Sequence, residues 1–380
     1  MLIHSDYNNH DLQTLFNMSK NCLVFLICIF LLCGCQSTFG PRALKNTHLA
    51  YNQVIANTSY QQMLLNLVRL KYRDAVYFLQ VGSVTASFSL GASLGLEAEL
   101  DFDPGGDLMK PNAGMSYSQS PTISYTPLQG EDFLKSVITP ISLEAILVMT
   151  QSGWSIRRVF GMCIERINNL TNAPRASGPT PEEAPKYKKF KRMLMLLRQL
   201  QLADLIEIGR ASNASSGNLV VRLKPDPNYQ NVLDELRSLL GVTQQSNQFM
   251  ISTNFLNAQE DQWDVRTRSI SSVLYYLSHN VEVPEKHKEA GLVTITETKD
   301  GEEFNWDDTP AGTMFKVRSS KWIKPGNAFI SVPYRGSWFY IADNDLQSKS
   351  TFKLLNALFS LQAGQIKDTS PTLTLPVGGG

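Results

Sequence analysis

Cysteine and histidine are scarce in this sequence, and their positions exclude several kinds of site. The chain of 380 residues has five of each, and Cys163 is the one cysteine after residue 35. A disulfide within that long segment is therefore impossible, and so is a zinc site built from several thiolates. No two histidines have the spacing of a zinc motif such as His-Glu-x-x-His. We expect no metal and no cofactor.

Cys163 itself lies among apolar neighbours in the sequence, which are Val159, Phe160, Met162 and Ile164. A buried thiol behaves as a small apolar side chain, whereas a reactive thiol needs exposure and nearby positive charge. The sequence therefore predicts a buried structural thiol rather than a nucleophile.

The chain also lacks an excess of positive charge. Its 35 Lys and Arg residues balance 34 Asp and Glu residues, which gives a formal net charge of +1. Proteins that bind nucleic acid need clustered basic residues that neutralise phosphates. We therefore expect no nucleic-acid partner.

Catalytic motifs are missing as well. The sequence contains no Walker loop, no dinucleotide-binding fingerprint and no G-x-S-x-G elbow at a strand-to-helix turn. We therefore expect a protein that is not an enzyme. An enzyme that uses carboxylates such as Glu144, Glu165 or Asp204 stays an open alternative, because two acids need only lie close in space. The acidic segment 297–308 does not follow the ligand order of an EF-hand, and we expect a solvated loop there.

One apolar run stands out near the N-terminus. Residues 23–32 are apolar and follow Lys20, and the run is too short to span a bilayer comfortably. This arrangement predicts a signal peptide over residues 1–34 rather than a transmembrane anchor. Residues 1–17 carry two Asp residues and no Lys or Arg, unlike the start of an export signal, so we expect translation to begin at Met18.

The apolar run ends in Leu32-Cys33-Gly34-Cys35, which resembles the bacterial lipobox. The resemblance implies that Cys35 is acylated with fatty acids such as palmitate and becomes the first residue of a mature lipoprotein. Gln36 follows instead of the Asp that holds proteobacterial lipoproteins at the inner membrane, which implies the periplasmic side of the outer membrane. A cleaved secretory signal with incidental cysteines is the alternative.

A long alternating segment is the most informative part of the sequence. Over residues 83–102 every even position is apolar and every odd position is small, polar or acidic. A period of two predicts an extended strand with two different faces, and strands are typically about five or six residues long. After a polar loop over residues 103–112, the alternation resumes. We therefore expect one long β-hairpin over residues 83–127, in which residue 102 pairs with residue 113.

In this register an even residue always faces an odd one, so the apolar residues of both strands share one face. We expect that face to meet a membrane or a partner. Its predicted residues are Phe88, Leu90, Leu94, Leu96, Leu100, Phe102, Met115 and Tyr117. Gln119 and Pro121 interrupt the apolar face in the second strand.

Three interpretations of the hairpin stay open. Its apolar face packs on the helices of the same chain, or several copies stand side by side as a membrane ribbon, or an edge docks onto a partner. Alternation of this kind is typical of outer-membrane strands. A single hairpin in lipid would leave unpaired edges, so insertion requires several copies. This logic resembles that of curli-export lipoproteins and stem-forming toxins, in architecture alone.

The rest of the chain mixes helical and strand patterns, and we expect an α+β fold. Helical periodicity occurs at about 46–72, 140–153, 155–169, 186–207, 228–240 and 262–279. Strand patterns occur at 217–224, 248–254, 291–298, 313–318, 327–333, 336–342 and 371–377. Four prolines within residues 171–185 predict an exposed loop.

The expected organisation has five parts. They are a signal peptide (1–34), a lipid tether with N-terminal helices (35–80), a long amphipathic hairpin (81–128), a helix-rich α+β body (129–281) and a C-terminal β-rich region with one helix (282–380).

Three phrases of the sequence, at residues 64–72, 121–128 and 334–341, are similar to those of uncharacterised proteobacterial lipoproteins. That resemblance implies no known activity. We expect an outer-membrane lipoprotein that is a structural or assembly component of a cell-envelope complex, with a secretion or export apparatus as one candidate. Its partners would be the outer membrane, through diacylglyceryl-Cys35, and other envelope proteins or further copies of itself. The alternative is a lipid-tethered periplasmic hydrolase or ligand-binding protein, recognisable as a monomer with a deep polar cleft.

Overall fold

A computed structural model of the chain describes residues 41–98, 109–210, 219–242, 246–253, 262–363 and 373–376. The expected signal peptide, Cys35, Leu100 and Phe102 lie outside the described residues. Residues 1–58 and 59–380 are separate units, and the elements below belong to the second unit apart from the first part of α2. The predicted α+β class is confirmed. Among the helices of the described ranges, none has the length and apolar character needed to cross a membrane.

Helix α2 (Pro41–Lys71) supplies the first part of the core. After residue 58, Met63, Leu64, Leu67 and Val68 are buried. These positions confirm the apolar stripe that helical spacing predicts for this helix.

The connection from α2 to the first strand is anchored by side chains. Asn66 accepts a hydrogen bond from the Tyr77 N–H (3.2 Å) and donates one to the Tyr77 carbonyl (2.6 Å). Asp74 accepts hydrogen bonds from Tyr334 and, at 2.9 Å, from Arg335. Because both ends of the connection are tied to packed elements, the start of the strand has a fixed position.

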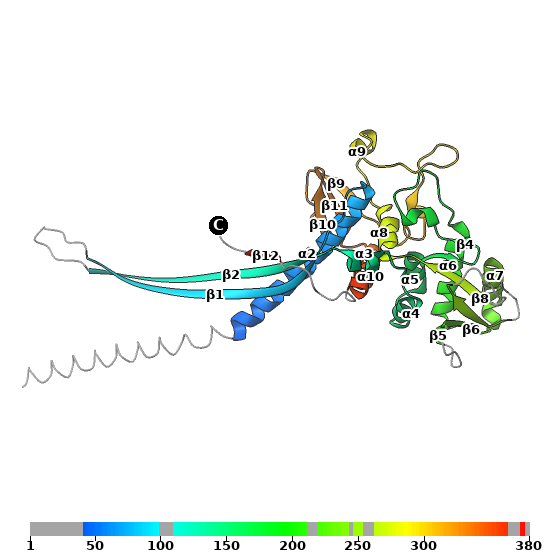
Figure 1. Cartoon of the computed structure of the whole chain (residues 1–380), viewed down its shortest axis with the longest axis horizontal. Helices are drawn as coiled ribbons and strands as arrows, with labels where there is room; N and C mark the ends of the chain where they lie inside the picture. The colour runs from blue at the N-terminus through cyan, green and yellow to red at the C-terminus, as the bar shows by residue number, and fades with distance from the viewer. Residues whose placement is uncertain are drawn as a thin grey trace, which may run out of the picture. The chain divides into compact units, whose positions relative to one another are not determined.

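Two long antiparallel strands, β1 (Phe78–Ala98) and β2 (Met109–Leu128), form the predicted hairpin. They lie side by side along their length, and the short strand β12 (Leu373–Pro376) pairs with residues 122–125 of β2 (Figure 1). The resulting sheet has the order β1-β2-β12, so β12 is an edge strand, as the pattern over 371–377 predicts. We call this sheet the ribbon.

The predicted offset between the two hairpin strands is wrong. It would pair Leu94 with Pro121, whereas the structure pairs Leu94 with Ala113. Residues 109–112 therefore pair within the ribbon instead of forming a loop. Alternation determines only parity, and both registers place even residues of β1 opposite odd residues of β2. The shared face was predictable for this reason, and the offset was not.

A six-stranded sheet of order β4-β3-β8-β7-β6-β5 lies in the body, and its neighbours are antiparallel except for β7 and β8. Its strands are β3 (Ile164–Ile167), β4 (Leu170–Thr171), β5 (Ile206–Arg210), β6 (Leu219–Leu223), β7 (Gln248–Ser252) and β8 (Gln262–Thr267).

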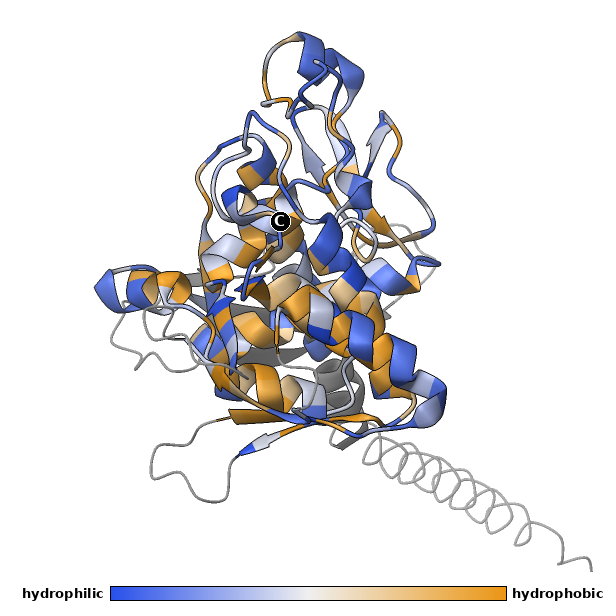
Figure 2. Ribbon diagram, turned by 90° about the vertical axis from the view of Figure 1, so that its right-hand side faces the viewer, coloured by the Kyte–Doolittle hydropathy of each residue, from blue (hydrophilic) through white to orange (hydrophobic). Residues whose placement is uncertain are grey.

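Helices precede, connect and follow these strands along the chain. They are α3 (Glu131–Ile138), α4 (Leu143–Gln151), α5 (Ile156–Cys163), α6 (Lys188–Leu202), α7 (Gln230–Leu240), α8 (Ile270–Ser278) and α9 (Glu285–Glu289), with short 3-10 turns η1 (Pro174–Ser177), η2 (Pro227–Tyr229) and η4 (Trp306–Asp308). Hydrophobic and hydrophilic residues alternate along the helical ribbons (Figure 2). The longer helices therefore have an apolar side to bury, such as that of α6 with Leu194 and Leu197.

Two predicted helices, 155–169 and 262–279, are each partly strand. Helix α5 ends at Cys163 and continues as β3, while β8 precedes α8. The two unexpected strands pair with each other, Ile164 opposite Thr267. Partners so distant in the sequence leave no trace in local periodicity, and tertiary pairing overrides helix propensity here.

The C-terminal region holds a three-stranded sheet of order β10-β11-β9 and one helix. Its elements are β9 (Arg318–Lys321), β10 (Ala328–Tyr334), β11 (Ser337–Ala342) and α10 (Leu346–Ala363). Arg335 and Gly336 both have positive φ, 46° and 73°, as a two-residue hairpin turn requires. Asp345 caps α10 by accepting a hydrogen bond from the Ser348 N–H at 3.0 Å. The strands predicted at 291–298 and 313–318 are wrong, because these residues form loops with isolated bridges, apart from Arg318, which begins β9.

The proline-rich segment 171–185 packs into the body, contrary to the prediction of an exposed loop. Asn172, Ala173 and Ala176 are fully buried. The guanidinium of Arg268, itself 1% exposed, donates hydrogen bonds to the carbonyls of Met162, Ile164, Asn172 and Ala173. Since these carbonyls are satisfied internally, the segment can leave the solvent despite its prolines.

Candidate functional site

The two faces of the ribbon differ at its base. Phe78, Ser124 and Thr126 are buried, whereas Leu79 is 42% exposed and Tyr125 is half-buried. Successive residues of a strand point to opposite sides. The even positions of β2 therefore face the body at the base, and its odd positions face away from it.

A shift in register between Val81 and Ser83 changes which positions of β1 share a face with β2. Before the shift Phe78 pairs with Leu128, even with even, and after it even residues pair with odd ones. The apolar even positions of β1 after the shift therefore share the face of Tyr125. At the base this face is turned away from the body, which is opposite to the interpretation that packs it on the chain's own helices.

The register assigns a place to the predicted site residues. Phe88, Leu90, Leu94 and Leu96 lie in β1, and Met115 and Tyr117 lie in β2. Leu90 is paired with Tyr117, so the two sets share a face, as parity predicts. Contact of this face with a membrane or a partner stays a prediction.

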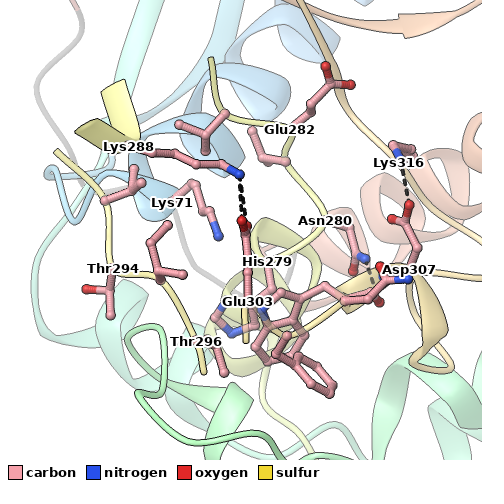
Figure 3. Close-up of a pocket in the computed structure, with 17 residues that line it drawn as sticks. Lys71, His279, Asn280, Glu282, Lys288, Thr294, Thr296, Glu303, Asp307 and Lys316 are labelled. Atoms are coloured by element: carbon pink, nitrogen blue, oxygen red, sulfur yellow. Dashed lines mark hydrogen bonds and ion pairs between the residues drawn. The ribbon is translucent and has the colours of Figure 1, made fainter. Parts of the chain in front are cut away.

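A second candidate site, which the sequence did not indicate, is a cavity of about 320 Å³ (Figure 3). We call it the Lys71 cavity. The end of α2 contributes Lys71, and the other walls come from residues 279–283, 293–296 and 303–307 together with Lys288 and Lys316. Its volume lies at the lower end of the range for small-molecule sites, about 300–1,000 Å³.

Lys71 is the most unusual residue of the cavity. It is 7% exposed, and its ammonium group has no hydrogen-bond or ion-pair partner among the described residues. Burial lowers its pKa to about 8, the negative charge of Glu303 acts in the opposite direction, and Lys288 lowers the pKa further. A lysine at the end of a helix is usually solvated, so nothing in the sequence distinguished it.

The other cations of the cavity are paired. The ammonium of Lys288 lies 2.9 Å from both carboxylate oxygens of Glu303, and that of Lys316 lies 2.6 Å from Asp307 (Figure 3). Glu303 and Asp307 belong to the acidic segment 297–308, which we expected to be a solvated loop. Most residues of this segment are exposed, as expected of a solvated loop, and Glu303 and Asp307 also serve as counter-ions in the cavity wall.

His279 and Trp306 form one wall. The two rings stack with their centroids 4.3 Å apart, and His279 Nε2 lies 3.0 Å from the Ala176 carbonyl. A carbonyl only accepts, so Nε2 carries the proton. Burial, followed by the charge of Lys71, lowers the pKa of His279 to about 3, and its buried Nδ1 has no hydrogen-bond partner in the part of the chain that the structure describes. This histidine is therefore neutral near pH 7.

Asn280 and Gly312 hold the neighbouring backbone in place. Asn280 Nδ2 donates a hydrogen bond to the Trp306 carbonyl at 3.1 Å. A Cβ on Gly312 would lie 2.1 Å from that carbonyl oxygen and 2.7 Å from Asn280 Nδ2. Only glycine fits this close approach.

The carboxylates named as catalytic alternatives do not line the cavity. Glu165 accepts a hydrogen bond from the Ser177 hydroxyl at 2.6 Å and lies near Arg266, while Asp204 is exposed beside Lys224. Glu144 lies in the exposed first turn of α4. The structure does not bring these three acids together.

Cys163 is completely buried, as predicted, and burial raises the pKa of its thiol to about 12. Such a thiol is not a nucleophile near neutral pH. In the described part of the chain, no group of three or more His, Cys, Asp or Glu side chains could hold a metal ion.

The chain was also compared with known proteins. The comparison with protein-family models, curated proteins and solved structures finds no match to this chain.

Proposed function

We propose that this protein is an outer-membrane lipoprotein, anchored through Cys35 on the periplasmic side, that forms oligomers through its ribbon as a structural or assembly component of an envelope complex. A secretion or export apparatus is one such complex. The observation that carries the proposal is a hairpin of 20-residue strands whose apolar residues share a face turned away from the body at the base.

The length of the strands supports this role. About nine to eleven residues cross a membrane as a tilted strand, and β1 and β2 have 21 and 20 residues. A two-stranded ribbon with a solvent-facing apolar side is marginally stable in water on its own. Further copies, lipid or another envelope protein would bury that side.

The open edges of the ribbon support association between copies. Along β1 the outer edge has no strand partner among the described residues, and β12 covers β2 only at residues 122–125. Long open edges are avoided in soluble proteins because they template pairing with other chains. Pairing of β1 with β2 of the next copy is a heterologous contact, which generates a closed ring when the rotation permits.

The test is a shortened ribbon. Residues 90–115 are deleted from the full chain and the strands are joined by Asn-Gly, which suits a two-residue turn. We expect native mass spectrometry in detergent to give a defined oligomer for the parent and a folded monomer for the shortened chain. A monomeric parent, or a shortened chain that still assembles, contradicts the proposal. Loss of folding favours the interpretation of a hairpin packed on the body.

A second candidate function is favoured by one observation, the unpaired Lys71 in its cavity. A lipid-tethered ligand-binding protein would use such a cavity.

A further inference from the structure

One of the three lysines that line the Lys71 cavity has no ion-pair partner among the described residues. Two of its three lysines are paired with Glu303 and Asp307. The remaining acid, Glu282, is exposed and accepts a hydrogen bond from Ser319, and its carboxylate points away from Lys71 (Figure 3). The lysine of the lining without a paired acid among the described residues is therefore Lys71.

This charge is available to a ligand. The side chain of Lys71 is more than nine-tenths buried and points into the cavity (Figure 3). A buried cation without a partner is costly, and an anion that pairs with it recovers part of that cost. An incoming negative group would therefore bind more tightly here than at a solvated lysine.

The other residues that line the cavity indicate the chemistry of the rest of the ligand. Val281, Val283, Val293 and Trp306 are buried apolar residues that line the cavity. Among the described residues that line it there is no arginine. Phosphate groups carry up to two charges and usually meet arginine forks or several backbone N–H groups. A single free ammonium group matches the single charge of a carboxylate better.

We propose that the Lys71 cavity binds a small monocarboxylate with an apolar body, its carboxylate paired with the ammonium of Lys71 and its body against the valine side chains and Trp306. This inference does not depend on assembly through the ribbon, because the cavity lies within one chain.

Thermal unfolding of the full chain in detergent tests the proposal. Butyrate and hexanoate are the probes, butanamide and hexanamide are neutral controls of the same shape, and inorganic phosphate is the third arm. We expect the carboxylates to raise the melting temperature and the amides to leave it unchanged. Equal effects of acid and amide overturn the pairing with Lys71, and stabilisation by phosphate alone overturns the carboxylate chemistry.

Calorimetric titration with hexanoate then assigns the residue. We expect Lys71→Met to weaken binding at least tenfold, whereas Lys135→Met, at an exposed lysine of α3, leaves it unchanged. Equal affinity of the parent and Lys71→Met overturns the proposal.

A measurement on the parent protein tests the proposal without depending on the folding of the Lys71→Met variant. The rate of acetylation of Lys71, followed by mass spectrometry of peptides, should fall in the presence of hexanoate and not of hexanamide. Labelling of Lys71 that hexanoate does not slow contradicts the proposal.

Discussion

Lys71 combines its proposed role in binding with a cost in stability. Its pKa is lowered from 10.5 to about 8 in the folded protein. Below pH 8 it is protonated in both the folded and the unfolded state, and the folded state bears the full cost of burying the charge. Between about pH 8 and 10.5 the unfolded chain binds a proton that the folded chain does not, so the free energy of unfolding rises with pH.

We therefore expect Lys71→Met to be more stable than the parent at pH 7, by about 3 kcal/mol from the size of the pKa shift. The difference should shrink as the pH rises from 8 to 10.5. Urea unfolding at pH 7 and pH 10.5 measures it, with Lys135→Met as the exposed control. A difference that does not change with pH would show that the buried charge is not its source.

Arg268 is also a buried cation, but it differs from Lys71 because all three nitrogens of its guanidinium donate hydrogen bonds. Replacement by Met keeps most of the volume and removes the donor that Arg268 supplies to the buried carbonyl of Asn172. We expect the free energy of unfolding to fall by at least about 3 kcal/mol. Arg266→Met, two residues earlier and 64% exposed in its side chain, should change it by less than about 1 kcal/mol. Chemical denaturation compares the two, and equal losses would contradict the assigned role of Arg268.

The two faces of the ribbon should differ in their tolerance of an added charge. Leu94 and Ser93 are adjacent in β1, paired with Ala113 and Gly114. Leu94→Arg adds a charge to the apolar face, which costs about 2–4 kcal/mol near a bilayer midplane, and we expect the oligomer to dissociate. Ser93→Arg, on the other face, should leave the oligomer intact. Native mass spectrometry distinguishes them, and equal behaviour would argue against a functional apolar face.

Some features of the ribbon could be predicted from the sequence, and others could not. The faces of β1 and β2 followed from alternation, because a period of two is a property of the chain itself. The offset between the strands and the shift near Val81 depend on contacts between strands, which a single sequence does not display. The pairing of β3 with β8 was missed for the same reason.

The Lys71 cavity could not be predicted from the sequence, for a different reason. Its walls come from loops such as 293–296 and 303–307, which have no periodicity to detect. The burial of Lys71 depends on several of these segments meeting. Composition described the residues correctly as polar and acidic, and it carried no information on their exposure.

The location of the protein depends on the modification of Cys35. The lipobox resemblance implies a fatty-acylated Cys35. We expect an alkyne fatty acid to label the parent and Cys33→Ala in cells, and not Cys35→Ala, because only the residue after the cleavage point is acylated. Equal labelling of the Cys35→Ala variant would contradict the lipid anchor.

The pairing of β12 with β2 has a consequence for any assembly built through the ribbon. Because β12 occupies residues 122–125, a neighbouring copy could extend the sheet on this edge only along residues 109–121. At about 3.4 Å per residue that leaves an open length of about 44 Å. Strand β12 would then limit the length over which two copies can pair along this edge. Removal of residues 373–376 would let the contact advance toward the body and change the spacing between neighbours.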